Sequence, residues 1–109
     1  MAMSKDEAIK IAKEFLKLIR QKYDVRQAYL FGSFAKETAK DYSDVDLAIV
    51  LGSLESSKES PFYNEDFMIF HEAQKYNSLL EVICFVQREF DQNGGTLVQL
   101  IKKEGIRLI

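Results

Sequence analysis

Cysteine, proline, histidine and tryptophan are scarce in this sequence, and the scarcity bears on its class. The 109 residues include one cysteine, one proline, one histidine and no tryptophan. The single cysteine, Cys84, excludes an internal disulfide and is compatible with a reducing cytoplasm, where we expect the protein. One proline and an apolar content of 47% are typical of a soluble globular domain.

Long apolar runs are also lacking. No run reaches the length needed to cross a membrane, and the N-terminal segment Met-Ala-Met-Ser-Lys-Asp-Glu has no apolar region of the signal-peptide kind. A net charge of −2 provides no overall attraction for nucleic acid, so we expect no membrane and no nucleic-acid partner. The chain is long enough for one core and too short for two, which predicts a single domain over residues 1–109.

The most informative stretch lies between residues 30 and 51, where two apolar segments flank a polar connection. The second segment opens with Asp44 and Asp46, and alternation along a strand places both on one face. Two carboxylates on a buried strand are costly unless their charge is compensated, and Mg²⁺ prefers such hard oxygen ligands. The pair therefore predicts a metal site.

Gly32 and Ser33 end the first of these segments. A glycine lets the backbone approach a ligand closely, and its neighbouring N–H groups together with the Ser33 hydroxyl can receive an anion. A phosphate-binding turn next to a metal-binding pair suggests nucleotide chemistry.

Apolar periodicity predicts an alternation of helices and strands. Helices are expected over residues 4–23, over 61–76 and between Gly95 and Gly105, with a short one starting at Ser33. Strands are expected over residues 25–31, 44–51 and 79–86, with a short apolar strand or tail over 106–109 and a polar loop over 52–60. This order indicates an α/β (α+β) fold, a small mixed sheet flanked by helices.

The expected helices carry apolar sides and begin or end at recognisable residues. Ser4 and Glu7 form a capping box at the start of the first helix. The expected apolar sides are Phe62, Phe67, Phe70 and Ala73 in the helix over 61–76, and Leu97, Leu100 and Ile101 in the last helix.

Three features allow two interpretations each. The basic excess on the polar face of the first helix is either a solvated surface or a contact for RNA or an acidic partner. His71 is either a packing or surface group or a catalytic residue. The sequence places no motif partner beside it for catalysis. Glu81 interrupts an apolar strand, so it either reaches solvent or a lysine at the strand end, or joins Asp44 and Asp46 as a third carboxylate.

The Gly32-Ser33 pair followed by Asp44-Val45-Asp46 resembles the signature of the DNA polymerase β nucleotidyltransferase superfamily, and of its minimal nucleotidyltransferases in particular. The resemblance implies the nucleotidyltransferase fold. It also implies that Asp44, Asp46 and Glu81 are catalytic ligands of Mg²⁺, with two ions at the site. The same resemblance makes Gly32, Ser33 and Lys36 nucleotide-binding residues.

The activity implied by this resemblance is transfer of a nucleoside monophosphate, AMP from ATP or another NTP, to an acceptor hydroxyl. In minimal nucleotidyltransferases the acceptor is a tyrosine of a helical HEPN toxin, and the transferase acts as its antitoxin. Acceptor selection would fall to such a partner or to a second subunit in a homo-oligomer.

The chain departs from its relatives near the phosphate site, which keeps a second interpretation open. Relatives often carry arginine where this chain has Phe34 or Lys36, and glycine where it has Glu37. A lysine lacks the bidentate fork of arginine, and a glutamate adds negative charge near the triphosphate. The alternative is an antitoxin or adaptor that binds and blocks its partner without catalysis.

Overall fold

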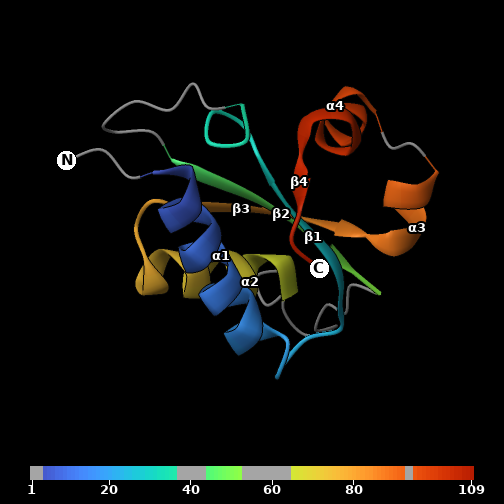
Figure 1. The fold of residues 1–109 in the computed structure, drawn as a ribbon. Coiled ribbons are helices and arrows are strands. Elements are labelled where there is room, and N and C mark those ends of the chain that lie inside the picture. The colour runs from blue at the N-terminus through green and yellow to red at the C-terminus, as the bar shows by residue number, and fades with distance from the viewer. Residues whose placement is uncertain (1–3, 37–43, 53–64, 93–94) are drawn as a thin grey trace.

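The computed structural model describes residues 4–36, 44–52, 65–92 and 95–109 (Figure 1). The elements in chain order are α1 (Lys5–Ile19), β1 (Val25–Phe31), β2 (Val45–Leu51), α2 (Glu65–Tyr76), β3 (Leu80–Val86), α3 (Gln87–Asp91), α4 (Thr96–Glu104) and β4 (Ile106–Arg107). None of the helices in these ranges is long and apolar enough to span a membrane.

The strands form one mixed sheet in the order β3-β2-β1-β4. β2 and β3 run parallel, whereas β1 is antiparallel to both β2 and β4. Because β1 opposes β2 and β3 in direction, its last residue meets the first residues of those strands at one end of the sheet. The predicted mixed sheet flanked by helices is therefore confirmed.

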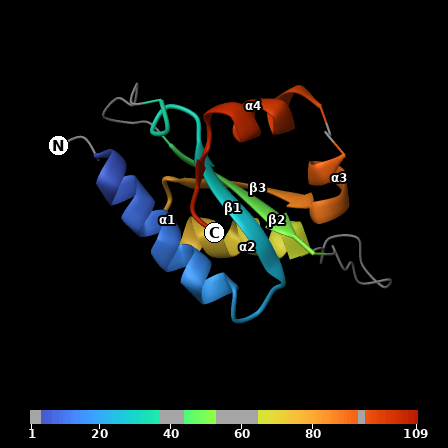
Figure 2. The same ribbon diagram turned by 45° about the vertical axis from the view of Figure 1, so that its right-hand side comes forward.

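Helices cover both faces of the sheet (Figure 2). α1 and α2 pack on one face, where Phe15 of α1 and Ile69 of α2 share a core with the odd-numbered residues of β2. α3 and α4 pack on the other face, where Phe90 and Ile101 meet Ala48 and Val50. The two-residue alternation predicted for this strand is thus confirmed, and it places Asp46 on the face of α3 and α4.

α1 begins as predicted and ends earlier. The Ser4 hydroxyl accepts a hydrogen bond from the backbone N–H of Glu7 at 3.1 Å, which caps the first turn. The helix ends at Ile19 and not near Tyr23, because residues 21–23 form tight turns whose N–H groups bond to the Leu18 and Ile19 carbonyls. Those turns redirect the chain into β1.

Three expectations for the helices are wrong in detail. Residues 32–36 form a turn with one helical bond, from Lys36 N–H to the Gly32 carbonyl at 3.2 Å, and no helix. On α2, Ala73 is buried as expected, but Phe70 is 39% exposed and Ile69 is buried in its place. α4 likewise buries Val98 with Ile101, and exposes the predicted core residues Leu97 and Leu100.

The reason for the last two errors is that helix rotation is set by the sheet. Ile69 and Val98 are the side chains that enter the two cores, and apolar periodicity alone does not choose between neighbouring apolar residues. The expectations for Glu37, Phe62, the side chain of Phe67, the start of the helix at Pro61 and the loop over 53–60 lie outside the described residues.

Candidate functional site

Three strands bring the predicted residues to one end of the sheet. Phe31, the last residue of β1, is the Cα partner of Asp46 in β2, and Asp46 is the Cα partner of Glu81 in β3. Gly32 follows Phe31 directly, and Asp44 directly precedes β2. The sequence-based placement of Gly32, Asp46 and Glu81 in one site is therefore matched by the strand register.

The carboxylates of this site interact strongly with one another. Asp46 is half-buried, whereas Asp44 and Glu81 are exposed. Burial, then the negative charges of Glu81 and Asp44, raise the pKa of Asp46 from 3.8 to about 6, and a hydrogen bond with the Glu81 side chain acts in the same direction. The folded site therefore disfavours the ionised form of Asp46.

Gly32 makes room for the Asp46 carboxylate. Its φ of +74° lies in the region that favours glycine. A Cβ at this position would collide with Asp46 Oδ2 and would lie 3.0 Å from Asp46 Cγ. The sequence predicted that the Gly32 backbone lies close to a ligand. The structure shows that it also lies close to the Asp46 carboxylate.

A surface cavity of about 410 Å³ opens beside the acids. Its lining comprises Phe31, Asp46, Phe70, Glu81, Val82 and Ile83. Two aromatic rings and two carboxylates thus border one hollow, which suits a ligand with both apolar and cationic or metal-bound parts. The sequence assigned Phe70 to the core, and no pattern marked it as a site residue.

Ser33 and Lys36 lie in the turn that follows Gly32. Phe34, between them, is buried in the core under α1 and α2. Lys36 Nζ lies 2.9 Å from Glu104 Oε2 at the end of α4. That oxygen is screened from solvent and makes no directed hydrogen bond to a described residue, so the ion pair compensates its charge. Lys36 is therefore engaged by α4 in this structure.

His71 lies apart from the acids. It is exposed on α2, with its ring edge-on to Phe70 at a centroid separation of 6.4 Å. It is not among the residues that line the acidic cavity. The geometry gives it a surface position next to Phe70, which does line the cavity.

The acids fit a magnesium ion that is shared with a substrate. Across the four described ranges, no group of three His, Cys, Asp or Glu side chains forms a metal site by itself. Mg²⁺ is commonly held by one or two carboxylates plus substrate phosphates, however, and retains several waters. Asp46 and Glu81 are adjacent hard-oxygen donors whose mutual repulsion a cation would relieve, so the donor set fits the ion.

Comparison with known proteins places this geometry in a family. Residues 13–109 match the model of the polymerase beta nucleotidyltransferase family. A comparison with curated proteins finds no match.

Solved structures share the fold at low sequence identity. A toxin–antitoxin crystal structure with AMP-PNP is 19% identical, with a TM-score of 0.62 over 90% of this chain and 72% of its own. A candidate nucleotidyltransferase from Sulfolobus solfataricus is 20% identical, with a TM-score of 0.59 over 98% of this chain and 87% of its own. The toxin–antitoxin complex MntA-HepT is 16% identical, with a TM-score of 0.56 over 92% of this chain and 70% of its own.

Proposed function

The chain belongs to the polymerase beta nucleotidyltransferase family, and we propose that it transfers AMP from ATP to an acceptor hydroxyl. The observation that carries the proposal is the pairing of Asp46 with Glu81 on parallel strands, beside the turn at Gly32. Two adjacent carboxylates next to a close-approach glycine supply the metal-binding and phosphate-binding halves of such a site.

The proposed roles follow from the position of each residue. Asp44, Asp46 and Glu81 would hold Mg²⁺, with two ions when a nucleotide is bound. Bound there, Mg²⁺ supplies neutralisation of the phosphate charge and lowers the pKa of the attacking hydroxyl. Gly32 and Ser33 hold the outer phosphates through backbone N–H groups and the hydroxyl, and Lys36 would join them if its ion pair with Glu104 opens.

In the proposed reaction the acceptor oxygen attacks the α-phosphorus of ATP. A new P–O bond forms, the bond to the bridging oxygen breaks, and pyrophosphate leaves with its electron pair. Glu81, exposed beside Asp46, takes the hydroxyl proton. Asp46 must be ionised to hold Mg²⁺, and its pKa of about 6 allows this at neutral pH.

We propose that the acceptor is a tyrosine of a HEPN toxin, and that the chain acts as the antitoxin in the cytoplasm. The support is the fold shared with two toxin–antitoxin structures, one of which contains AMP-PNP. The experiment is to copurify the chain with its partner and to weigh the partner before and after incubation with ATP and Mg²⁺. A gain of one or more AMP masses is expected.

The matched variants for this experiment are Asp46→Asn and Glu89→Gln. Asp46→Asn removes the negative charge of Asp46, one of the three carboxylates of the site, and should abolish the mass gain. Glu89→Gln removes a charge from an exposed residue of α3 and should leave the gain unchanged. Full transfer by Asp46→Asn would overturn the assignment of the site.

The second candidate is an antitoxin that binds its partner without catalysis, and the engagement of Lys36 by Glu104 favours it. Titration of the chain with ATP in a calorimeter, with and without Mg²⁺, separates the two candidates. A transferase binds ATP in a metal-dependent manner, and Glu104→Gln should tighten that binding by releasing Lys36. The absence of metal-dependent binding in both proteins would favour the non-catalytic antitoxin.

A further inference from the structure

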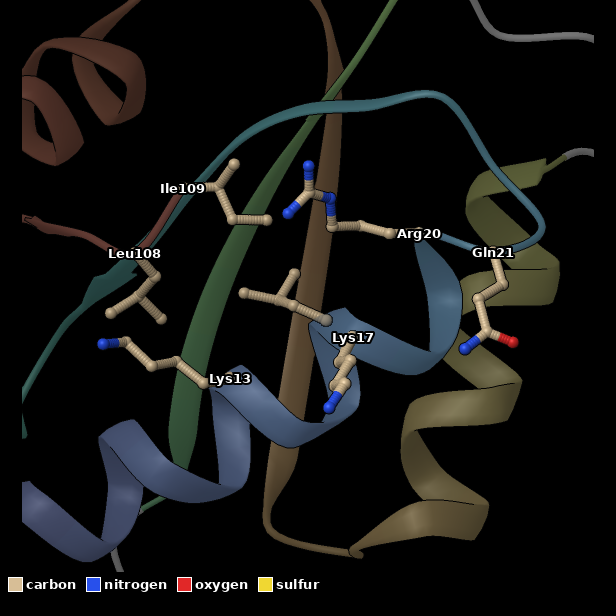
Figure 3. A pocket seen from close by; sticks show the side chains of 7 residues that line it. Lys13, Lys17, Arg20, Gln21, Leu108 and Ile109 are labelled. Carbon is tan, nitrogen blue, oxygen red and sulfur yellow. The ribbon is translucent and has the colours of Figure 1, made fainter.

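A second hollow, of about 520 Å³, lies between α1 and the end of the described chain (Figure 3). Its lining comprises Lys13, Leu16, Lys17, Arg20, Gln21, Leu108 and Ile109. Figure 3 shows the Lys13 side chain beside Leu108 and the Arg20 side chain beside Ile109, with Lys17 on the helix between them in sequence. We call this site the basic hollow.

The three cations of the basic hollow form one stripe along α1 and the residue that follows it. Lys13, Lys17 and Arg20 follow each other at helical spacing, and all three are exposed. None of their side chains has a hydrogen bond or ion pair with any residue in the described parts of the chain. Like charges four residues apart destabilise a helix, so an anionic occupant would relieve a repulsion that no side chain of the described residues compensates by an ion pair.

The acids of α1 do not provide that compensation. Asp6 and Glu7 lie in the first turn, away from the hollow. Glu14 accepts a hydrogen bond from the Tyr76 hydroxyl of α2 at 3.1 Å.

Apart from Gln21, the remaining wall of the basic hollow is apolar and packs on the core of the sheet. Leu16 belongs to the core, and Leu108 and Ile109 are half-buried against it. The N–H of Leu108 donates to the Ala28 carbonyl at 2.7 Å, and Arg107 Nε donates to the Ile109 carbonyl at 2.8 Å. The hollow thus combines fixed apolar surface with a cationic rim.

The basic hollow is separate from the acidic site. Its residues on α1 lie in the half of the helix that leads into β1, whereas the acidic site lies where β1 ends. The linings of the two hollows have no residue in common. Changes in the hollow can therefore be made without touching the acids.

We propose that the basic hollow is a docking site for a short acidic segment of a partner protein that also carries apolar side chains. The carboxylates would meet the three cations, and the apolar side chains would cover Leu16, Leu108 and Ile109. A nucleic acid fits less well, because the lining has no aromatic side chain on which a base could stack and the chain is acidic overall.

The test is the binding of a fluorescent peptide of glutamates and leucines to the whole chain, followed by anisotropy. We expect saturable binding that weakens as salt is raised, since exposed charges are screened. Lys17→Glu should weaken binding about tenfold, because one attraction becomes a repulsion. The control Lys103→Glu changes an exposed lysine of α4 and should bind as the unchanged chain does.

The same experiment contains the outcomes that overturn the proposal. Replacing the peptide leucines by serine must weaken binding, or the apolar wall has no role. Equal loss in Lys17→Glu and Lys103→Glu would show only a general charge effect. Tighter binding of a single-stranded RNA, lost in Lys17→Glu, would make the hollow a nucleic-acid site. Self-association of the chain that Lys17→Glu abolishes would make a second copy the occupant. Circular dichroism of each variant verifies that it is folded.

Discussion

Gly32 and Asp46 depend on each other at the residue scale. The missing side chain of Gly32 leaves the space that the Asp46 carboxylate fills, so one residue positions the other. The carboxylate in turn is held beside Glu81 despite the repulsion between them. The rest of the fold therefore holds two mutually repelling carboxylates, Asp46 and Glu81, in a fixed arrangement.

Gly32→Ala should lower the free energy of unfolding by about 1–3 kcal/mol and reduce ATP binding, because the new Cβ displaces Asp46. Urea unfolding and calorimetry measure the two effects. Gly95→Ala is the control, since Gly95 also has a positive φ but has open space around it. Equal losses of stability and equal ATP binding in the two variants would show that backbone strain, and not displacement of Asp46, is the cause.

At the scale of elements, the face of the sheet that carries α3 and α4 depends on one aromatic residue. Phe90 of α3 stacks on Tyr29 of β1 at 5.4 Å and contacts the Phe85 ring of β3 at 5.7 Å. Lys102 of α4 lies over the Phe90 ring and donates a hydrogen bond to the Phe90 carbonyl. Phe90 thus joins two strands and two helices.

Phe90→Ala should lower the free energy of unfolding by about 3–5 kcal/mol, the usual cost of a cavity left by a buried phenylalanine. Phe70→Ala removes the same group from a residue that is 39% exposed and should cost much less. Thermal or urea unfolding measures both. A small loss for Phe90→Ala would mean that α3 and α4 collapse onto the sheet without it.

The sequence predicted those elements whose apolar pattern is strong on its own. β1 begins and ends where expected, and the alternation along β2 predicted which of its faces carries Asp46. α3 was missed because its five residues include a single apolar one, Phe90, which cannot show a period.

The sequence likewise predicted only those site residues that lie at the ends of strands with a strong apolar pattern. Gly32, Asp46 and Glu81 lie at the ends of recognisable strands, so their meeting follows from strand order. The contacts of Lys36 with Glu104, and of Phe70 with the acidic cavity, join elements far apart in sequence. No local pattern encodes them.

At the scale of the whole molecule, Asp46 links stability to pH. Its pKa rises from 3.8 to about 6 on folding, so the folded chain binds more protons there than the unfolded chain does. The stabilisation from this group is therefore fully present below the unfolded pKa of 3.8 and is lost as the pH rises through the folded pKa of about 6. Because Asp46 is about half exposed, solvent screening reduces the effect at neutral pH to about 1 kcal/mol.

Asp46→Asn should therefore be more stable than the unchanged chain by about 1 kcal/mol at neutral pH, with a difference that shrinks as the pH falls towards 4. Urea unfolding of both proteins across this range measures the difference, in which the effects of other titrating groups cancel. A difference that stays constant with pH would show that Asp46 titrates as an ordinary carboxyl.

The turn over residues 32–36 is anchored from both faces of the sheet. Phe34 is buried in the core under α1 and α2, and Lys36 is paired with the end of α4 on the opposite side. The conformational entropy of these residues is thus lost when the chain folds, and not when a ligand arrives. If Gly32 and Ser33 bind a nucleotide as proposed, the nucleotide meets a backbone that is already ordered, so more of its interaction energy is retained as affinity.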